Sequence, residues 1–120
     1  MNAPGETDLG RLVADLKPAL SDERYVFEAT DRTILEPEIF ALVREKEGLT
    51  AVRVDPAGEW ALISMGVHSS LEAVGLTAAL SAVLAGAGIS ANVVAALHHD
   101  HIFVPWDRRE DALKALNSLA

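Results

Sequence analysis

The sequence predicts an α+β fold in which helices cover one face of an antiparallel sheet, the ferredoxin-like sandwich. The second half of the chain carries the prediction, because its patterns follow the order strand, helix, strand, strand, helix. This order is a split β-α-β unit, whose helices pack together on one face of the sheet. Half of the 120 residues are hydrophobic, which suffices for a buried core at this length.

The first half begins with a polar stretch. Residues 1–7 are rich in polar and turn-forming types and predict a flexible N-terminal tail. Leucine and valine at helical spacing then predict a helix over 8–18. Alternation of large apolar and polar residues predicts a strand over 25–30.

A second helix and strand are predicted before the middle of the chain. Pro37 suits the first turn of a helix, and the apolar residues at 39–43 supply its buried face. Gly48 is a typical residue just beyond a helix C-terminus. Residues 50–54 predict a strand, which the turn at 55–58 closes.

The second half is patterned more clearly. Residues 60–67 form an apolar run of strand length. Ser69 and Glu72 match a capping box and predict that a helix begins at Ser69 and continues to about residue 87. A further strand is predicted over 89–97.

A turn at 98–101 leads into the last predicted elements. Residues 102–106 predict the returning strand of a hairpin, and Asp107 with Glu110 predict the cap of a final helix. Together the elements predict a tail over 1–7, a divergent N-terminal subdomain over 8–58 and a C-terminal domain over 59–120.

Composition excludes several classes of function. The chain has 10 basic and 18 acidic residues and a formal net charge of −8, which argues against a nucleic-acid-binding face. It has no cysteine, so disulfides and thiolate sites are excluded. With no signal peptide or membrane-length apolar stretch, a soluble, cytoplasmic protein without a membrane partner is expected. Since no catalytic or phosphate-binding motif occurs, no catalytic residue, enzyme activity or cofactor is expected.

The second half carries Val74-Gly75-Leu76 at the entry to the helix and Gly88-Ile89-Ser90 before the next strand. Asp100 and the run 103–105 continue the pattern through the hairpin. With these residues the second half resembles the ACT domain, in the variety found in CASTOR proteins and small bacterial relatives, and residues 66–72 resemble the loop of the bacterial relatives. The first half is similar to the divergent ACT-like portion of those relatives, so the resemblance implies two ACT-like subdomains.

This resemblance implies a non-catalytic regulatory module that binds a small ligand, expected to be an amino acid, at an interface between two ACT units. The partner is then a second copy in a homodimer, or an enzyme or regulator. By position, the implied ligand-binding residues lie in the loop after the strand and at the start of the next strand. They are Gly66, Val67, His68, Ser69, Ser70, Leu71, Glu72, Val74, Gly75, Ser90 and Asn92.

Each feature of this site also has a purely structural interpretation. Free N–H groups at a helix N-terminus attract a carboxylate, but Ser69 can equally serve only as a helix cap. Asn92 can bind a ligand or be an ordinary edge-strand amide. A ligand-independent dimerisation or protein-interaction module therefore stays open as the alternative function.

The histidines in the predicted turn raise the question of a metal site. A tight hairpin turn would bring His98 and His101 opposite each other, within chelating distance. A stable zinc site normally needs a third protein ligand, and the sequence supplies none at a fixed spacing. We therefore expect no metal at this turn.

Overall fold

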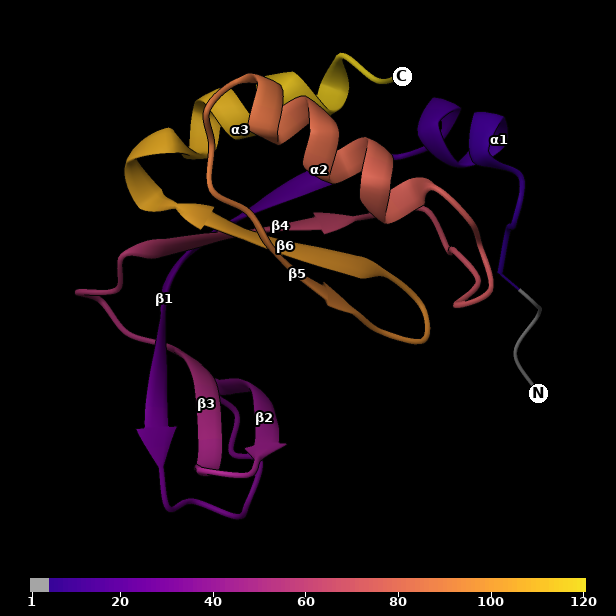
Figure 1. Ribbon diagram of the computed structural model, residues 1–120. Helices are drawn as coiled ribbons and strands as arrows, with labels where there is room; N and C mark the ends of the chain where they lie inside the picture. The colour runs from indigo at the N-terminus through magenta and orange to yellow at the C-terminus, as the bar shows by residue number, and fades with distance from the viewer. Residues whose placement is uncertain (1–4) are drawn as a thin grey trace.

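One antiparallel sheet of six strands, in the order β2-β3-β1-β4-β6-β5, runs through the molecule (Figure 1). The computed structural model describes residues 5–120. The strands are β1 (Pro18–Thr30), β2 (Ile39–Glu45), β3 (Gly48–Val54), β4 (Trp60–Met65), β5 (Asn92–Ala95) and β6 (Asp100–Pro105). The helices are α1 (Leu9–Ala14), α2 (Leu76–Gly86) and α3 (Arg109–Asn117), and a 3-10 turn, η1 (Trp106–Arg108), precedes α3. No described helix is long and apolar enough to cross a membrane.

Strand β1 joins the two halves of the molecule. Its first part pairs with β4, from Pro18 opposite Met65 to Leu20 opposite Ile63. The register with β4 shifts before Arg24, and the rest of β1 pairs with β3. Such an irregularity bends a strand, and beyond it β1, β3 and β2 turn away from the rest of the sheet as an arm (Figure 1).

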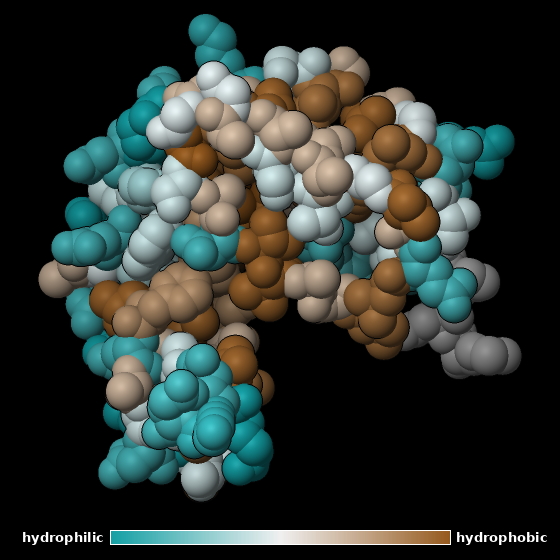
Figure 2. All heavy atoms as spheres, in the orientation of Figure 1, coloured by the Kyte–Doolittle hydropathy of each residue, from teal (hydrophilic) through white to brown (hydrophobic). Residues whose placement is uncertain are grey.

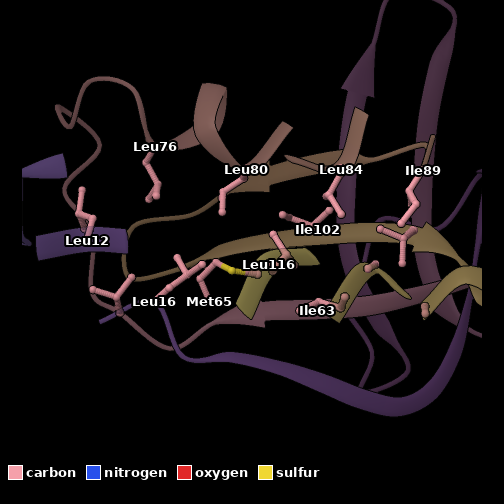
Figure 3. Close-up of a cluster of buried hydrophobic side chains, with 14 residues drawn as sticks. Leu12, Leu16, Ile63, Met65, Leu76, Leu80, Leu84, Ile89, Ile102 and Leu116 are labelled. Carbon is pink, nitrogen blue, oxygen red and sulfur yellow. The ribbon is translucent and has the colours of Figure 1, made fainter. Parts of the chain in front are cut away.

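The main core lies between the helices and one face of the sheet. Leu76, Leu80 and Leu84 of α2 point at the sheet, toward side chains such as Ile63 and Ile102 (Figure 3). Leu12 and Leu16, which flank the end of α1, close one end of this core. The predicted α+β sandwich with its helices on one face is thus confirmed, and β4-α2-β5-β6-α3 follows the predicted order.

A second, aromatic cluster covers the opposite face of the sheet, where the arm bends. Phe103 is fully buried at its centre, with edge-on contacts to Tyr25, Phe27 and Phe40 at ring-centroid distances of 5.1 to 5.4 Å. Figure 2 shows that the molecule is hollowed between the arm and the body.

The first predicted helix is shorter than expected. Asp8 caps α1 by accepting a hydrogen bond from the Arg11 N–H at 2.9 Å, but the helix ends at Ala14. Lys17 has a φ of 49°, which reverses the chain, and β1 begins at Pro18. The helical spacing of the leucines continued past Ala14 because Leu12 in α1 and Leu16 in the link after it are both buried in the core.

The predicted helix around residues 37–47 is wrong, because this segment forms strand β2. Its apolar run is only five residues long, and a run of that length does not distinguish a strand from a helix. Pairing with β3 from Ile39 to Glu45 decides the outcome, and Gly48 begins β3 in a tight hairpin instead of ending a helix.

The predicted tail over 1–7 is described only from Gly5, since residues 1–4 lie outside the described part. Glu6 forms a parallel bridge with Ser69 and is therefore held against the body of the molecule. The domain boundary expected between residues 58 and 59 falls in the turn before β4. The sheet continues across it through β1, and the boundary stays a prediction.

Candidate ligand-binding site

The loop 66–75, where most of the expected ligand-binding residues lie, is held by the N-terminal part of the chain. The N–H groups of Gly66 and Val67 donate to the carbonyls of Lys17 and Leu16 at 2.9 and 3.2 Å. On the other side, Glu6 accepts from the Ser70 N–H and donates to the His68 carbonyl, each at 2.9 Å. These backbone bonds fix the path of the loop without using its side chains.

Helix α2 begins at Leu76, so the predicted capping box at Ser69 and Glu72 is wrong. Gly75 is the N-cap, with a left-handed φ of 96°, and no side chain caps the helix. The Ser69 hydroxyl instead donates to the Asp100 carboxylate at 3.2 Å. Because the first N–H groups of an α-helix have no partner within it, α2 presents unpaired donors here.

A small cavity of about 60 Å³ lies beside the start of α2. Three of the expected residues line it, namely Ser69, Ser70 and Leu71. Its other lining residues were not predicted from the sequence; they are Ala73, Leu76, Thr77, Ala95 and Asp100. The cavity thus combines helix N–H groups, which favour an anion, with a carboxylate, which favours a cation.

Asp100 is the most informative of the missed residues. It is only 7% exposed and is the first residue of β6. The sequence offered one signal, an acid directly before an apolar strand, but its polar neighbours suggested a solvent-exposed turn. A buried carboxylate is uncommon unless it is paired, so its position beside the cavity is notable.

The remaining expected residues of the loop do not line this cavity. Gly66 and Glu72 are exposed, and Val74 exposes 83% of its surface. Leu71, which does line the cavity, exposes 65%. Val67 is buried, and with His68 it lines a broad hollow of about 700 Å³ on the other side of the loop. The rest of that hollow is formed by Gly5, Glu6, Arg11, Ala14 and Asp15.

Within one chain, Ser90 and Asn92 are not brought to the loop. Both are exposed, and Asn92 pairs with Phe103 at one end of β5. Ala95, at the other end, pairs with Asp100 beside the cavity. Since β5 is an edge strand of the sheet, its outer side is open to another molecule.

Three histidines gather where the loop meets the β5–β6 hairpin. The rings of His68 and His98 stack with centroids 5.3 Å apart, and His99 lies 6.4 Å from each. His99 Nδ1 is also 3.1 Å from the carbonyl oxygen of Val67. Among residues 5–120, no group of three or more histidine, aspartate or glutamate side chains is arranged to hold a metal ion.

His101 does not lie opposite His98 as the turn pattern suggested. Its side chain lies on the sheet, where Nδ1 is 2.8 Å from the Ser64 hydroxyl and the ring contacts Phe40 edge-on. Burial lowers the pKa of His101 below its ordinary value, and the neighbouring His99 lowers it further.

The split β-α-β unit thus places the uncapped start of α2 beside a small polar cavity. The chain belongs to the ACT domain family. One family model, described as an ACT domain, matches residues 57–118, and a second ACT domain model matches residues 4–59. The chain is therefore a small tandem ACT protein. Domains of this family generally serve regulatory ligand binding, with amino acids as ligands.

The chain is also similar to solved structures. The chain is 40% identical to VC0802 from Vibrio cholerae, a protein of unknown function described as a possible transport protein. The match covers 89% of this chain and 92% of that one, with a TM-score of 0.75. No curated protein matches the chain.

Two more distant structures share the fold alone. Atu0741 from Agrobacterium tumefaciens is 18% identical with a TM-score of 0.65, over 87% of this chain and 88% of that one. The ligand-free regulatory subunit of aspartate kinase from Thermus thermophilus is 11% identical with a TM-score of 0.67. That match covers 88% of this chain and 98% of the subunit.

Proposed function

We propose that this protein is a non-catalytic regulatory module that binds an amino acid between the loop 66–75 of one ACT unit and the edge strand β5 of another. The observation that carries the proposal is the cavity at the start of α2, with its uncapped helix N-terminus and buried Asp100. A free amino acid has a carboxylate and an ammonium group, which match these two features.

The size of the cavity supports an interface site. Ligand pockets typically enclose about 300–1,000 Å³, whereas this cavity holds about 60 Å³ within one chain. Its surroundings are apolar and exposed, because Leu71, Val74 and Leu97 each expose more than 60% of their surface. Hydrophobic residues gather at the tip of the β5–β6 hairpin, beside the hollow between the arm and the body (Figure 2). A second copy docked here would enlarge and cover the cavity.

The same docking would explain the position of Ser90 and Asn92. Both lie on or next to the open edge of the sheet, away from the loop of their own chain. An antiparallel partner would place its own copies of these residues near the loop. In this arrangement each site needs both chains.

A regulatory function agrees with the polar contacts in the cavity. The Ser69 hydroxyl is bound to a carboxylate and not to an imidazole that could activate it as a nucleophile. Regulation would then reach a partner enzyme or regulator through the change of interface that the ligand causes.

A thermal-shift screen of the purified protein against the twenty amino acids tests the proposal. A ligand at one hundred times its dissociation constant adds about 2.7 kcal/mol of stability, which raises the melting temperature of a domain this size by several degrees. Asp100→Asn, and Ser69→Ala combined with Ser70→Ala, should reduce that shift. Ser81→Ala, on α2 and away from the cavity, serves as the matched control and should keep it.

An amino acid that binds equally well to all these variants would show that the site lies elsewhere. Sedimentation should also show that the ligand tightens the dimer, since both chains line the site. A ligand that binds a strictly monomeric protein with unchanged affinity would contradict the interface.

A ligand-independent interaction module is the second candidate. The exposed Leu71, Val74 and Leu97 favour it, because such a group of large apolar residues typically marks a protein-protein contact. Dimerisation that Leu97→Asp abolishes, and that no amino acid changes, would favour this function over the first.

A further inference from the structure

Trp106 and two arginines form a cluster at the end of the sheet opposite the loop 66–75. Strand β4 begins and β6 ends here, and the Trp106 N–H donates to the Glu59 carbonyl at 2.8 Å. The guanidinium carbons of Arg24 and Arg109 lie 4.6 and 3.9 Å from the centre of a Trp106 ring. Both cations are therefore held by attraction to the ring face.

Arg24 is fixed by a second contact. It is the first residue of β1 that pairs with β4 after the register shift, and such irregularities often redirect side chains next to functional sites. Its Nε donates to the Gly58 carbonyl at 2.7 Å. Gly58 must be glycine, because a Cβ there would lie 2.4 Å from the Tyr25 carbonyl oxygen.

These contacts leave the outer end of Arg24 unused. Within residues 5–120, neither of its Nη nitrogens donates a hydrogen bond, and no carboxylate oxygen lies within 4.0 Å of it. A guanidinium held rigidly with free donors is well prepared to bind a carboxylate, since little side-chain freedom remains to be lost.

A cavity of about 320 Å³ lies beside Arg24, within the range of small-molecule sites. It is lined by Arg24, Glu59, Trp60, Pro105, Trp106 and Asp107. Within residues 5–120, the carboxylates of Glu59 and Asp107 form no ion pair with Arg24, so the lining carries one cation and two separate carboxylates. This arrangement suits a ligand with a carboxylate for Arg24 and an amine for the two acids.

We propose that this cavity, here called the tryptophan pocket, is a second binding site for a small molecule that carries both a carboxylate and an amine. The site is separate from the loop site and lies wholly within one chain. Its carboxylate contact is Arg24, and its amine contacts are Glu59 and Asp107.

The chain provides a built-in reporter for this proposal. Its two tryptophans, Trp60 and Trp106, both line the tryptophan pocket, and the cavity at the loop contains none. Tryptophan emission is therefore titrated with each of the twenty amino acids, with acetate as a carboxylate alone and methylamine as an amine alone. We expect a saturable change with at least one amino acid, and a much weaker response to acetate and methylamine.

Matched variants locate the binding. Arg24→Gln should weaken the fluorescence-detected affinity at least about tenfold, as expected for a lost charged hydrogen bond. Arg44→Gln, an exposed arginine on β2, is the control and should leave the affinity unchanged. If Arg24→Gln does not fold, Glu59→Gln with Asp107→Asn replaces it, and this variant should weaken amino-acid binding while acetate binding is kept.

The outcomes separate this site from the loop site. Ser69→Ala with Ser70→Ala should leave the fluorescence titration unchanged even where it abolishes a thermal shift due to the loop. No emission change with any amino acid would overturn the proposal. A change that persists unaltered in Arg24→Gln, or in the Glu59 and Asp107 variant, would overturn it as well.

Discussion

Gly75 sets the point at which the loop becomes helix α2. Its φ of 96° is left-handed, and a Cβ there would lie 3.1 Å from Leu9 Cδ2. Gly75→Ala should therefore lose about 1–2 kcal/mol of unfolding free energy, the cost of a left-handed L-residue. Gly86→Ala is the matched control, because it lies in α2 with nothing near its Cβ. It should gain up to about 1 kcal/mol.

Urea denaturation measures both glycine variants. An equal effect of the two substitutions would contradict a special role for the backbone at Gly75. Gly75→Ala should also weaken ligand binding, because the substitution shifts the start of α2, which lies beside the cavity.

The partly buried His101 makes stability depend on pH. Burial is the main reason that the pKa of His101 lies below the ordinary value of 6.5. As the pH falls, His101 is therefore protonated in the unfolded chain before it is protonated in the folded one. This histidine therefore lowers the stability of the folded state as the pH drops below about 6.5.

His101→Gln removes that dependence. We expect the loss of unfolding free energy between pH 7 and pH 5 to be smaller in the variant than in the parent, as measured by urea denaturation at both pH values. Two parallel pH profiles would show that His101 titrates alike in the folded and unfolded chains.

Single residues also explain why the site was only partly predictable. Ser69 and Glu72 have the spacing of a capping box, but Ser69 bonds to Asp100, which lies 31 residues further along the chain. A local pattern cannot contain such a partner. The loop itself was predicted from the resemblance, whereas Asp100 and the pairing of Glu6 with the loop depend on tertiary contacts.

At the scale of elements, strand β2 shows how neighbours override local preference. The residues at 39–43 have apolar side chains compatible with a helix, yet Phe40 packs against Tyr25, His101 and Phe103. In contrast, the strands predicted over 50–54 and 60–67 form as β3 and β4, and the predicted last helix forms as α3, because their apolar patterns agree with the final burial.

The aromatic cluster tests how firmly the arm is attached. Phe103 is fully buried and contacts aromatic rings from both β1 and β2. Phe103→Ala should lose about 3–5 kcal/mol of unfolding free energy, measured by urea denaturation. Phe27→Ala, which removes a ring that is 39% exposed, should lose less. A smaller loss for Phe103→Ala than for Phe27→Ala would mean that the arm is held by other contacts.

At the scale of the whole molecule, the C-terminal half depends on the N-terminal half. Without β1, strand β4 would have an open edge, and the core would lack Leu12 and Leu16. A fragment of residues 59–120 should therefore fail to unfold cooperatively, as judged by circular dichroism on heating.

The control is a rearranged chain in which the segment that contains α1 and β1 is attached to the C-terminus of the fragment. A chain in which residues 8–31 follow residue 120 through a flexible linker supplies the missing strand and should regain a cooperative transition. A fragment that folds as firmly without β1 would show that the C-terminal half is independent.

The shared strand also has a consequence during synthesis. As the chain leaves the ribosome, β3 can pair with the second part of β1, and β2 with β3, once residue 54 has emerged. The first part of β1 must wait for β4, which is made later. Contacts between distant segments form slowly. The second part of β1 is therefore paired with β3 while its first part still lacks its partner β4. The arm can therefore form before β4 is made, and it positions the strand on which the rest of the sheet is completed.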